Sequence, residues 1–189
     1  MDIEPLDIKG AWLAHSDVID DERGSFREWF KSKEIEKFTR FNFNCAQGNV
    51  SQSTKGTVRG IHYSLSSEGQ AKWVTCVSGS IMDFIVDIRP NSQTYGQWIK
   101  VELNANSGRS VLIGKNLGHA FISLEEKTVV AYLLDSEYSP EEEFAINPLD
   151  LDLAIEWGHE YSTMQFSQKD QLAPSLKEMN FRNKLPMIS

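Results

Sequence analysis

The stretch KWVTCVSGSIMDFIVDI, residues 72–88, decides the fold class. Its two halves are rich in β-branched and aromatic residues, and the three-residue link Ser78-Gly79-Ser80 between them includes a glycine. Two such runs joined by a short glycine-containing link predict a β-hairpin. The inward side chains of this hairpin should therefore form part of the core.

Similar short runs recur on both sides of the hairpin, separated by turn residues such as those at 104–108 and 114–118. This spacing favours a mainly β protein, a sandwich or barrel with a few short helices, over repeated βαβ units. A helix is expected at residues 30–38, with Phe30, Ile35 and Phe38 within reach of one face, and a short turn after Pro174. The other expected strands are residues 25–29, 41–47, 57–65, 97–103, 110–114, 119–124 and 128–134.

The length and composition fit one folded domain spanning residues 1–189, of which 40% are hydrophobic and 24% charged. The tail from Asp152 carries Trp157, Phe166 and Leu172, so we expect it to pack on the sheets. The longest apolar run, residues 129–134, is far shorter than the ~20 residues that span a bilayer. With no signal-peptide pattern at the N-terminus, a soluble cytoplasmic protein is expected.

The charge balance limits the partners. The chain has 19 basic and 27 acidic residues, a net charge of -8, and no lysine or arginine run, which disfavours binding to nucleic-acid backbones. An anionic ligand must then be met by a local pocket. Cys45 and Cys76 share no CxxC spacing and lie in strand-like runs, so buried, reduced thiols are expected.

The most informative segment for function is KGTVRGIHY, residues 55–63. Simple alternation in a strand places Arg59, Ile61 and Tyr63 on one face and His62 on the other, unless Gly60 permits a bulge. The structural alternative is an exposed arginine and a hydrogen-bonded strand histidine. The segment alone does not decide between these interpretations.

Other candidate groups are scattered along the chain. Metal-binding cupins use an HxH pair followed by a glutamate, but His62-Tyr63-Ser64 supplies one histidine, so no metal is expected. His62 can accept a proton near neutral pH, and a tyrosine can donate one. Each candidate has a structural alternative: Tyr132 as a core tyrosine, Asp170 as a turn or cap residue, and Lys72 as a solvated edge charge.

Taken together, these segments resemble the dTDP-4-dehydrorhamnose 3,5-epimerase family, whose members are cupin-fold jelly rolls. The resemblance runs from about residue 19 to residue 176. The matching positions are residues 21–26, Glu28, Phe30, Gln47, Asn49, Ser51, Ser53, 56–63, 70–72, 86–89, 95–98, 118–121, Tyr132, Tyr138, Pro140, Glu141, Glu143, Asp150, 153–157, Lys169, Asp170, Ala173 and Pro174.

The resemblance implies a nucleotide-sugar epimerase that inverts carbon 3, carbon 5 or both in a dTDP-4-keto-6-deoxyhexose. By similarity, His62 is the base, Asp170 orients its imidazole, and Tyr132 returns a proton from the opposite face. Lys72 would lie beside the enolate oxygen. No metal or other cofactor is expected, because the ketone itself acidifies the hydrogens that are removed.

The resemblance also implies a substrate site and a homodimer. Arg59 would neutralise the diphosphate and His119 would line the sugar pocket. The nucleotide would lie between subunits, which would also protect exposed strand edges. Gln47, Asn49 and Tyr138 would contact the base and ribose; Arg23, Phe26 and Glu28 would reach across from the partner; Glu143 and Lys169 complete the implied substrate-binding set.

Four departures from the family pattern leave the substrate open. They are Gly48, the turn at residues 114–118, Asn147 and Gly158, none of which removes the base, the acid or the orienting aspartate. Two alternatives stay open from the sequence: a non-catalytic sugar-binding cupin that keeps the pocket, and a 3,4-ketoisomerase, which is a related cupin enzyme. Retention of His62, Tyr132, Lys72 and Asp170 together favours the epimerase.

Overall fold

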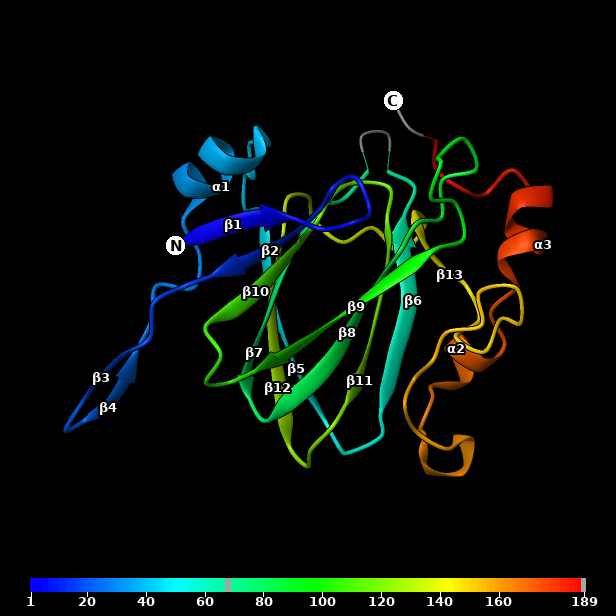
Figure 1. The fold of residues 1–189 in the computed structure, drawn as a ribbon. Helices are drawn as coiled ribbons and strands as arrows, with labels where there is room; N and C mark the ends of the chain where they lie inside the picture. Colours follow the sequence, from blue (N-terminus) through cyan, green and yellow to red (C-terminus); the bar gives the residue numbers. More distant parts are fainter. Residues whose placement is uncertain (67–68, 188–189) are drawn as a thin grey trace.

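The computed structural model describes residues 1–66 and 69–187, which form two antiparallel β-sheets packed face to face with short helices outside them (Figure 1). One sheet has the order β1 (Asp2–Pro5), β2 (Ala11–His15), β10 (Arg109–Ile113), β7 (Lys72–Ser78), β12 (Thr128–Leu134), β5 (Gln47–Ser53). The other has the order β13 (Glu143–Ala145), β6 (Val58–Ser64), β11 (Gly118–Ser123), β8 (Ser80–Val86), β9 (Trp98–Asn104). Apart from β1 with β2 and β8 with β9, neighbouring strands of the two sheets are not consecutive in sequence, as in a jelly roll.

The remaining elements lie outside the two sheets. A hairpin of β3 (Ile19–Asp21) and β4 (Gly24–Phe26) projects away from the body of the molecule (Figure 1). The helices are α1 (Ser32–Thr39), α2 (Gln168–Gln171) and α3 (Leu176–Phe181), with a 3-10 turn at Tyr161–Thr163. A capping box between Ser175 and Glu178 begins α3 just after Pro174.

The core lies between the sheets because the strands alternate their side chains. On β7, Val74 and Cys76 face the other sheet and join a cluster with Ile81 and Ile85 of β8. On the opposite face of β7, Trp73 belongs to a separate cluster with Ile35 of α1. The same alternation places Lys72, two residues before Val74, on the inner face.

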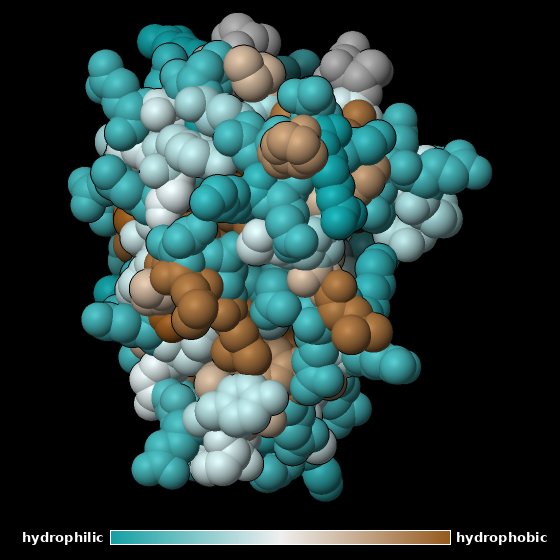
Figure 2. Space-filling model, turned by 90° about the vertical axis from the view of Figure 1, so that its right-hand side faces the viewer, coloured by the Kyte–Doolittle hydropathy of each residue, from teal (hydrophilic) through white to brown (hydrophobic). Residues whose placement is uncertain are grey.

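The segment that follows β13 forms a second layer over the outer face of the five-stranded sheet. Trp157, Leu176 and Met179 are buried there against Phe84 and Ile122. The tail is therefore folded on the sheet, as expected. Figure 2 shows the surface of this layer, where apolar side chains lie among hydrophilic ones. Its exposed apolar residues include Leu151, Leu172 and Phe181.

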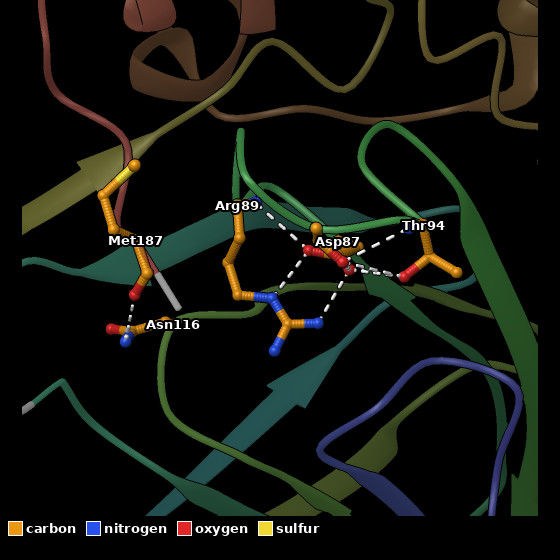
Figure 3. Close-up of polar contacts among 6 residues, drawn as sticks. Asp87, Arg89, Thr94, Asn116 and Met187 are labelled. Atoms are coloured by element: carbon orange, nitrogen blue, oxygen red, sulfur yellow. Dashed lines mark hydrogen bonds and ion pairs between the residues drawn. The ribbon is translucent and has the colours of Figure 1, made fainter. Parts of the chain in front are cut away.

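A buried ion pair fixes the loop that follows β8. Arg89 donates two hydrogen bonds to Asp87, at 2.8 and 2.7 Å, and Thr94 donates another at 2.6 Å (Figure 3). Burial raises the pKa of Asp87, but the hydrogen bonds from Arg89, Ser92 and Thr94 outweigh it and leave that pKa lowered. Nearby, the amide of Asn116 donates to the Met187 carbonyl and ties down the C-terminal segment (Figure 3).

The mainly β fold is confirmed, but the predicted hairpin is wrong: β7 and β8 do not pair with each other and belong to different sheets. The link Ser78-Gly79-Ser80 carries the chain from one sheet to the other, and the inward side chains of both strands still form part of the core. Other details were predicted wrongly. Residues 41–46 form no strand, which leaves Cys45 exposed while Cys76 is buried, and both thiols are free. The early strand ends at Phe26 instead of residue 29, Phe38 is 42% exposed, and Leu172 is 76% exposed. No prediction covered β1, β2, β3, β13 or most of β5.

Over the part of the chain that the structure describes, no helix has both the length and the apolar character needed to cross a bilayer.

Candidate active site

A cavity of about 150 Å³ lies between the two sheets. The six-stranded sheet contributes residues from β5, β7 and β12, and the five-stranded sheet contributes residues from β6 and β11. The two walls therefore carry different functional groups that face each other. The lining residues are Ser51, Arg59, His62, Lys72, His119, Phe121 and Tyr132.

A bulge in β6 brings two of these residues into the same cavity. His62 pairs with His119 and Arg59 with Phe121, so Gly60 and Ile61 together face one residue of β11. Gly60 has φ +109°, and a Cβ there would lie 2.4 Å from the His119 carbonyl oxygen. The simple alternation was therefore wrong, and the alternative that Gly60 permits a bulge is correct.

His62 forms a close pair with a carboxylate from a distant segment. Its Nε2 lies 2.7 Å from Oδ1 of Asp170, whose side chain is 4% exposed, against 38% for His62. Burial raises the pKa of Asp170, but hydrogen bonds from His62, Ser167 and the Gly60 N–H outweigh it and leave that pKa lowered. An ionised Asp170 accepts a hydrogen bond from the Nε2–H group, so Nδ1 is the ring nitrogen left to take a proton.

A second imidazole–carboxylate pair lies deeper between the sheets. Nε2 of His119 is 2.7 Å from Oδ2 of Asp83, which is buried on the inner face of β8. Burial raises the pKa of Asp83, against opposing effects of His119 and Lys72. Burial lowers the pKa of the Lys72 amine, against the attraction of Glu143 and Asp83. The structure thus disproves the alternative that Lys72 is a solvated edge charge.

Tyr132 projects into the cavity from the opposite wall to His62. On β12 it pairs with Asn49 on one side and Val74 on the other, and it is partly buried. Its ring packs against the core cluster between the sheets, and it also lines the cavity. Tyr132 thus combines core packing with access to the same space as His62.

The cavity continues into an outer recess of about 320 Å³, which shares Arg59 and His62 with it. Arg59 is exposed, and its guanidinium donates to Ser53 Oγ at 3.0 Å and to the Gln52 carbonyl at 3.1 Å. Lys169 of α2 lines the same recess. Two cations therefore border this opening in a chain of net charge -8.

The predicted base and ribose residues lie together at the edge strand β5. Gln47 and Asn49 alternate with exposed neighbours, and the Gln47 amide donates to Asn49 Oδ1 at 2.9 Å. The backbone N–H of Tyr138 donates to Gln47 Oε1 at 2.8 Å. Glu143 begins β13 and is close enough to Lys72 to affect its pKa.

Three predicted residues lie apart from this cavity within the chain. Arg23 and Phe26 belong to the projecting β3–β4 hairpin, and Glu28 follows it (Figure 1). Arg23 forms an ion pair with Asp21 at 2.5 Å, and Glu28 pairs with Lys31. None of the three lines either recess of the candidate site.

Several site residues had been given no role from the sequence. Asp83 interrupts the apolar run of β8, and that interruption is a signal that could have been used. Ser51 follows Gln47 and Asn49 in the two-residue alternation of β5. Among the described residues, buried Ser51 Oγ, Asp83 Oδ1 and Glu143 Oε1 have no hydrogen-bond partner.

Across residues 1–66 and 69–187, no three His, Cys, Asp or Glu side chains lie together in a group that could hold a metal ion.

The sequence is similar to proteins of one enzyme family. The family model for dTDP-4-dehydrorhamnose 3,5-epimerase matches residues 5–178. A dTDP-4-dehydrorhamnose 3,5-epimerase of Mycolicibacterium smegmatis is 39% identical over 186 residues, 98% of this chain and 91% of that protein. A dTDP-4-dehydro-6-deoxyglucose 3-epimerase of a Streptomyces species is 40% identical over 174 residues, 92% of this chain and 88% of the relative.

Solved structures agree with the fold. The rmlC epimerase of Mycobacterium tuberculosis superposes with a TM-score of 0.95 at 35% identity, covering 99% of this chain and 94% of that one. A 3'-monoepimerase of Streptomyces bikiniensis, solved in complex with dTDP-quinovose, gives 0.92 at 38% identity, covering 97% and 92%. The similar proteins thus include both 3,5-epimerases and 3-epimerases.

Proposed function

The chain belongs to the dTDP-4-dehydrorhamnose 3,5-epimerase family, which makes it an isomerase, and we propose that it inverts carbon 3, carbon 5 or both of a dTDP-4-keto-6-deoxyhexose. The observation that carries the residue assignment is the two-walled cavity. One wall holds an imidazole oriented by a carboxylate, and the other holds a phenol and an amine.

The reaction requires this kind of arrangement. A ketone at carbon 4 acidifies the hydrogens on carbons 3 and 5, so a base can remove one of them and leave an enolate. Inversion follows when a proton returns from the opposite face. A base and an acid on opposing sheets can each act from one face of a sugar held between them.

His62 removes the proton in this proposal. The ionised Asp170 fixes the ring with Nε2 protonated, leaves Nδ1 free to accept, and stabilises the imidazolium once it forms. The C–H electron pair moves into the enolate, whose negative oxygen lies near the Lys72 amine. The unpartnered Ser51 hydroxyl is a further donor on that wall.

Tyr132 then donates its phenolic proton to the carbon, and the carbonyl reforms. Water that reaches the cavity through the outer recess can restore the proton to Tyr132 and take the one held by His62. Since every step is a proton transfer, the balance needs no redox cofactor.

The nucleotide end of the substrate fits the outer recess and strand β5. Arg59 and Lys169 supply the positive charge that a diphosphate needs, and Arg59 is already oriented by Ser53. Gln47, Asn49 and Tyr138 offer polar and aromatic groups for the base and ribose, as the resemblance implied.

We propose in addition that the protein acts as a homodimer in which the β3–β4 hairpin reaches the partner. Ile19 and Phe26 on the hairpin are 60% and 63% exposed, and Val50 on the edge strand β5 is 72% exposed. Pairing of two copies would cover these residues. Arg23, Phe26 and Glu28 would then complete the partner's nucleotide site. Size-exclusion chromatography with light scattering tests this; a monomer at micromolar concentration would overturn it.

Proton NMR in deuterium oxide with dTDP-4-keto-6-deoxyglucose tests the reaction. Exchange and inversion at both carbons identify a 3,5-epimerase, and exchange at carbon 3 alone identifies a 3-epimerase. Movement of the ketone to carbon 3 would indicate a ketoisomerase instead. Saturable binding without exchange would indicate a non-catalytic sugar-binding protein, and either of the last two results overturns the proposal.

A further inference from the structure

We infer that Asn147 is a positioning residue that holds Asp170 against His62. The kinetic part of this inference rests on the proposed function, whereas its structural part concerns the ion pair alone. Asn147 is one of the departures from the family pattern noted in the sequence, and it lies outside both recesses of the site.

Two hydrogen bonds from Asn147 join its turn to the segment that carries Asp170. Its side-chain amide donates to the Gln171 carbonyl at 3.0 Å, and its backbone N–H donates to the Pro174 carbonyl at 2.9 Å. Its Oδ1 accepts from the Leu149 N–H at 2.8 Å, which fixes the side chain in its own turn. The first bond holds the last residue of α2, the helix that carries Asp170, and the second holds Pro174, just beyond the end of that helix.

The other side of Asn147 is attached to the strand that carries His62. The preceding residue, Ile146, exchanges backbone hydrogen bonds with Ile61, at 2.9 and 3.3 Å. Ile61 is the neighbour of His62 in β6. The contacts therefore close a ring that passes from His62 through Ile61, Ile146, Asn147 and α2 to Asp170 and back to His62.

The helix α2 needs such an anchor. It has four residues, too few to be stable without tertiary contacts. On its N-terminal side, Gln165 exchanges backbone hydrogen bonds with Gly56 and Val58, and Ser167 caps the helix by accepting from the Asp170 N–H. On its C-terminal side, the Asn147 side chain binds the last helical carbonyl. Loss of that bond should let Asp170 move relative to His62.

Asn147→Ser removes the bond to Gln171 while keeping a short acceptor for the Leu149 N–H and adding no charge. We expect the deuterium-exchange rate to fall on the order of tenfold, through kcat more than KM, because the misplaced group is the orienter of the base. Asn180→Ser is the matched control: Asn180 is exposed on α3 in the same layer. It should leave the rate unchanged.

The pH–rate profile separates positioning from general loss of structure. Asp170 accepts a hydrogen bond from the His62 ring and stabilises its positive charge, so loosening the pair should move the acid limb of the profile to lower pH. The titration of the His62 ring protons by NMR, without substrate, should shift in the same direction. A variant that is merely less folded loses rate at all pH values without this shift.

A double-mutant cycle completes the test. In an Asp170→Asn background, Asn147→Ser should have little further effect on the His62 titration, because the group that it positions is gone. An equal effect in both backgrounds, or an unmoved titration in the single variant, would overturn the inference. Because the titration needs no substrate, failure of the proposed reaction leaves this result interpretable.

Discussion

Two histidine–aspartate pairs with the same 2.7 Å separation lie in this molecule, and they differ in their surroundings. His62 is 38% exposed in its side chain and opens to both recesses, while His119 is 11% exposed. Their aspartates are both buried, at 4% and 0% side-chain exposure. The two carboxylates therefore differ in how deep they lie below the surface and in the hydrogen bonds that they receive.

Asp170 receives hydrogen bonds from His62, Ser167 and the Gly60 backbone, which together lower its pKa despite burial. Among the described residues, Asp83 has one oxygen with no partner, and burial raises its pKa. In the His62–Asp170 pair, an ionised carboxylate supports an accessible imidazole, and this arrangement suits a base. In the His119–Asp83 pair, the carboxylate is buried beside Lys72, and this arrangement suits positioning of the Lys72 amine.

The largest expected effect is a loss of proton exchange, and it tests directly whether only one of the two histidines acts as the base. His62→Asn should lower deuterium incorporation at the substrate carbons by about a hundredfold to ten-thousandfold, because every proton removal begins at this ring. His119→Asn should cost at most about tenfold, since it lines the cavity without removing a proton. Both rates are measured by proton NMR in deuterium oxide.

His15→Asn is the control for these two variants, because His15 lies on β2 with a side chain that is 41% exposed. It should keep the parent rate. Equal losses in His62→Asn and His119→Asn would mean that both pairs take part in proton removal and that the assignment from their surroundings is wrong.

The sequence predicted the general fold well because β7 and β8 carry strong apolar and β-branched patterns. It failed where strands are short or polar. β5 reads QGNVSQS, with no apolar stripe, because its inner face lines the site instead of the core. β1, β3 and β13 have three or four residues each and give too little pattern to detect.

The candidate site, too, could be predicted only in part from the sequence. Alternation along β6 could not place Arg59 and His62 together, because the bulge depends on how closely Gly60 approaches β11. Asp170 lies 108 residues from His62, so only the fold brings them into contact. The resemblance supplied that pairing as an implication, and the structure places the two side chains in contact.

The second-largest expected effect is a loss of inverted product when Tyr132, on the cavity wall opposite His62, is changed. Tyr132→Phe keeps the ring packing but removes the proposed proton donor. We expect exchange to continue, since His62 still removes protons, while the yield of inverted product falls about tenfold or more. Proton NMR of exchange and inversion in the same sample separates the two.

Tyr63→Phe provides the contrasting control. The Tyr63 hydroxyl donates to the Lys184 carbonyl at 2.7 Å, and burial raises its pKa, as expected of a structural tyrosine. Its loss should lower the free energy of unfolding by about 1 kcal/mol and leave inversion unchanged. If Tyr132→Phe behaves in this way instead, Tyr132 is a core residue and the acid is another group.

The smallest expected effect is on the pH dependence of stability, which should differ between Asp170 and Asp83. The folded pKa of Asp170 is lowered, so its contribution to stability is present above the unfolded value near 4 and is lost as pH falls through the folded value. The folded pKa of Asp83 is raised, so its contribution is present below about 4 and declines as pH rises through the folded value. The two aspartates should therefore respond to pH in opposite directions.

Urea unfolding followed by tryptophan fluorescence between about pH 3 and pH 7 measures this contrast in Asp170→Asn and Asp83→Asn. The stability lost in Asp170→Asn should grow with pH, because the wild-type carboxylate gains its hydrogen bonds as it ionises. The loss in Asp83→Asn should shrink with pH, because the neutral amide avoids the cost of burying a charge. Slopes of the same sign would mean that the two carboxylates share one environment, and the division of labour between the two pairs would then have to rest on the exposure of the imidazoles alone.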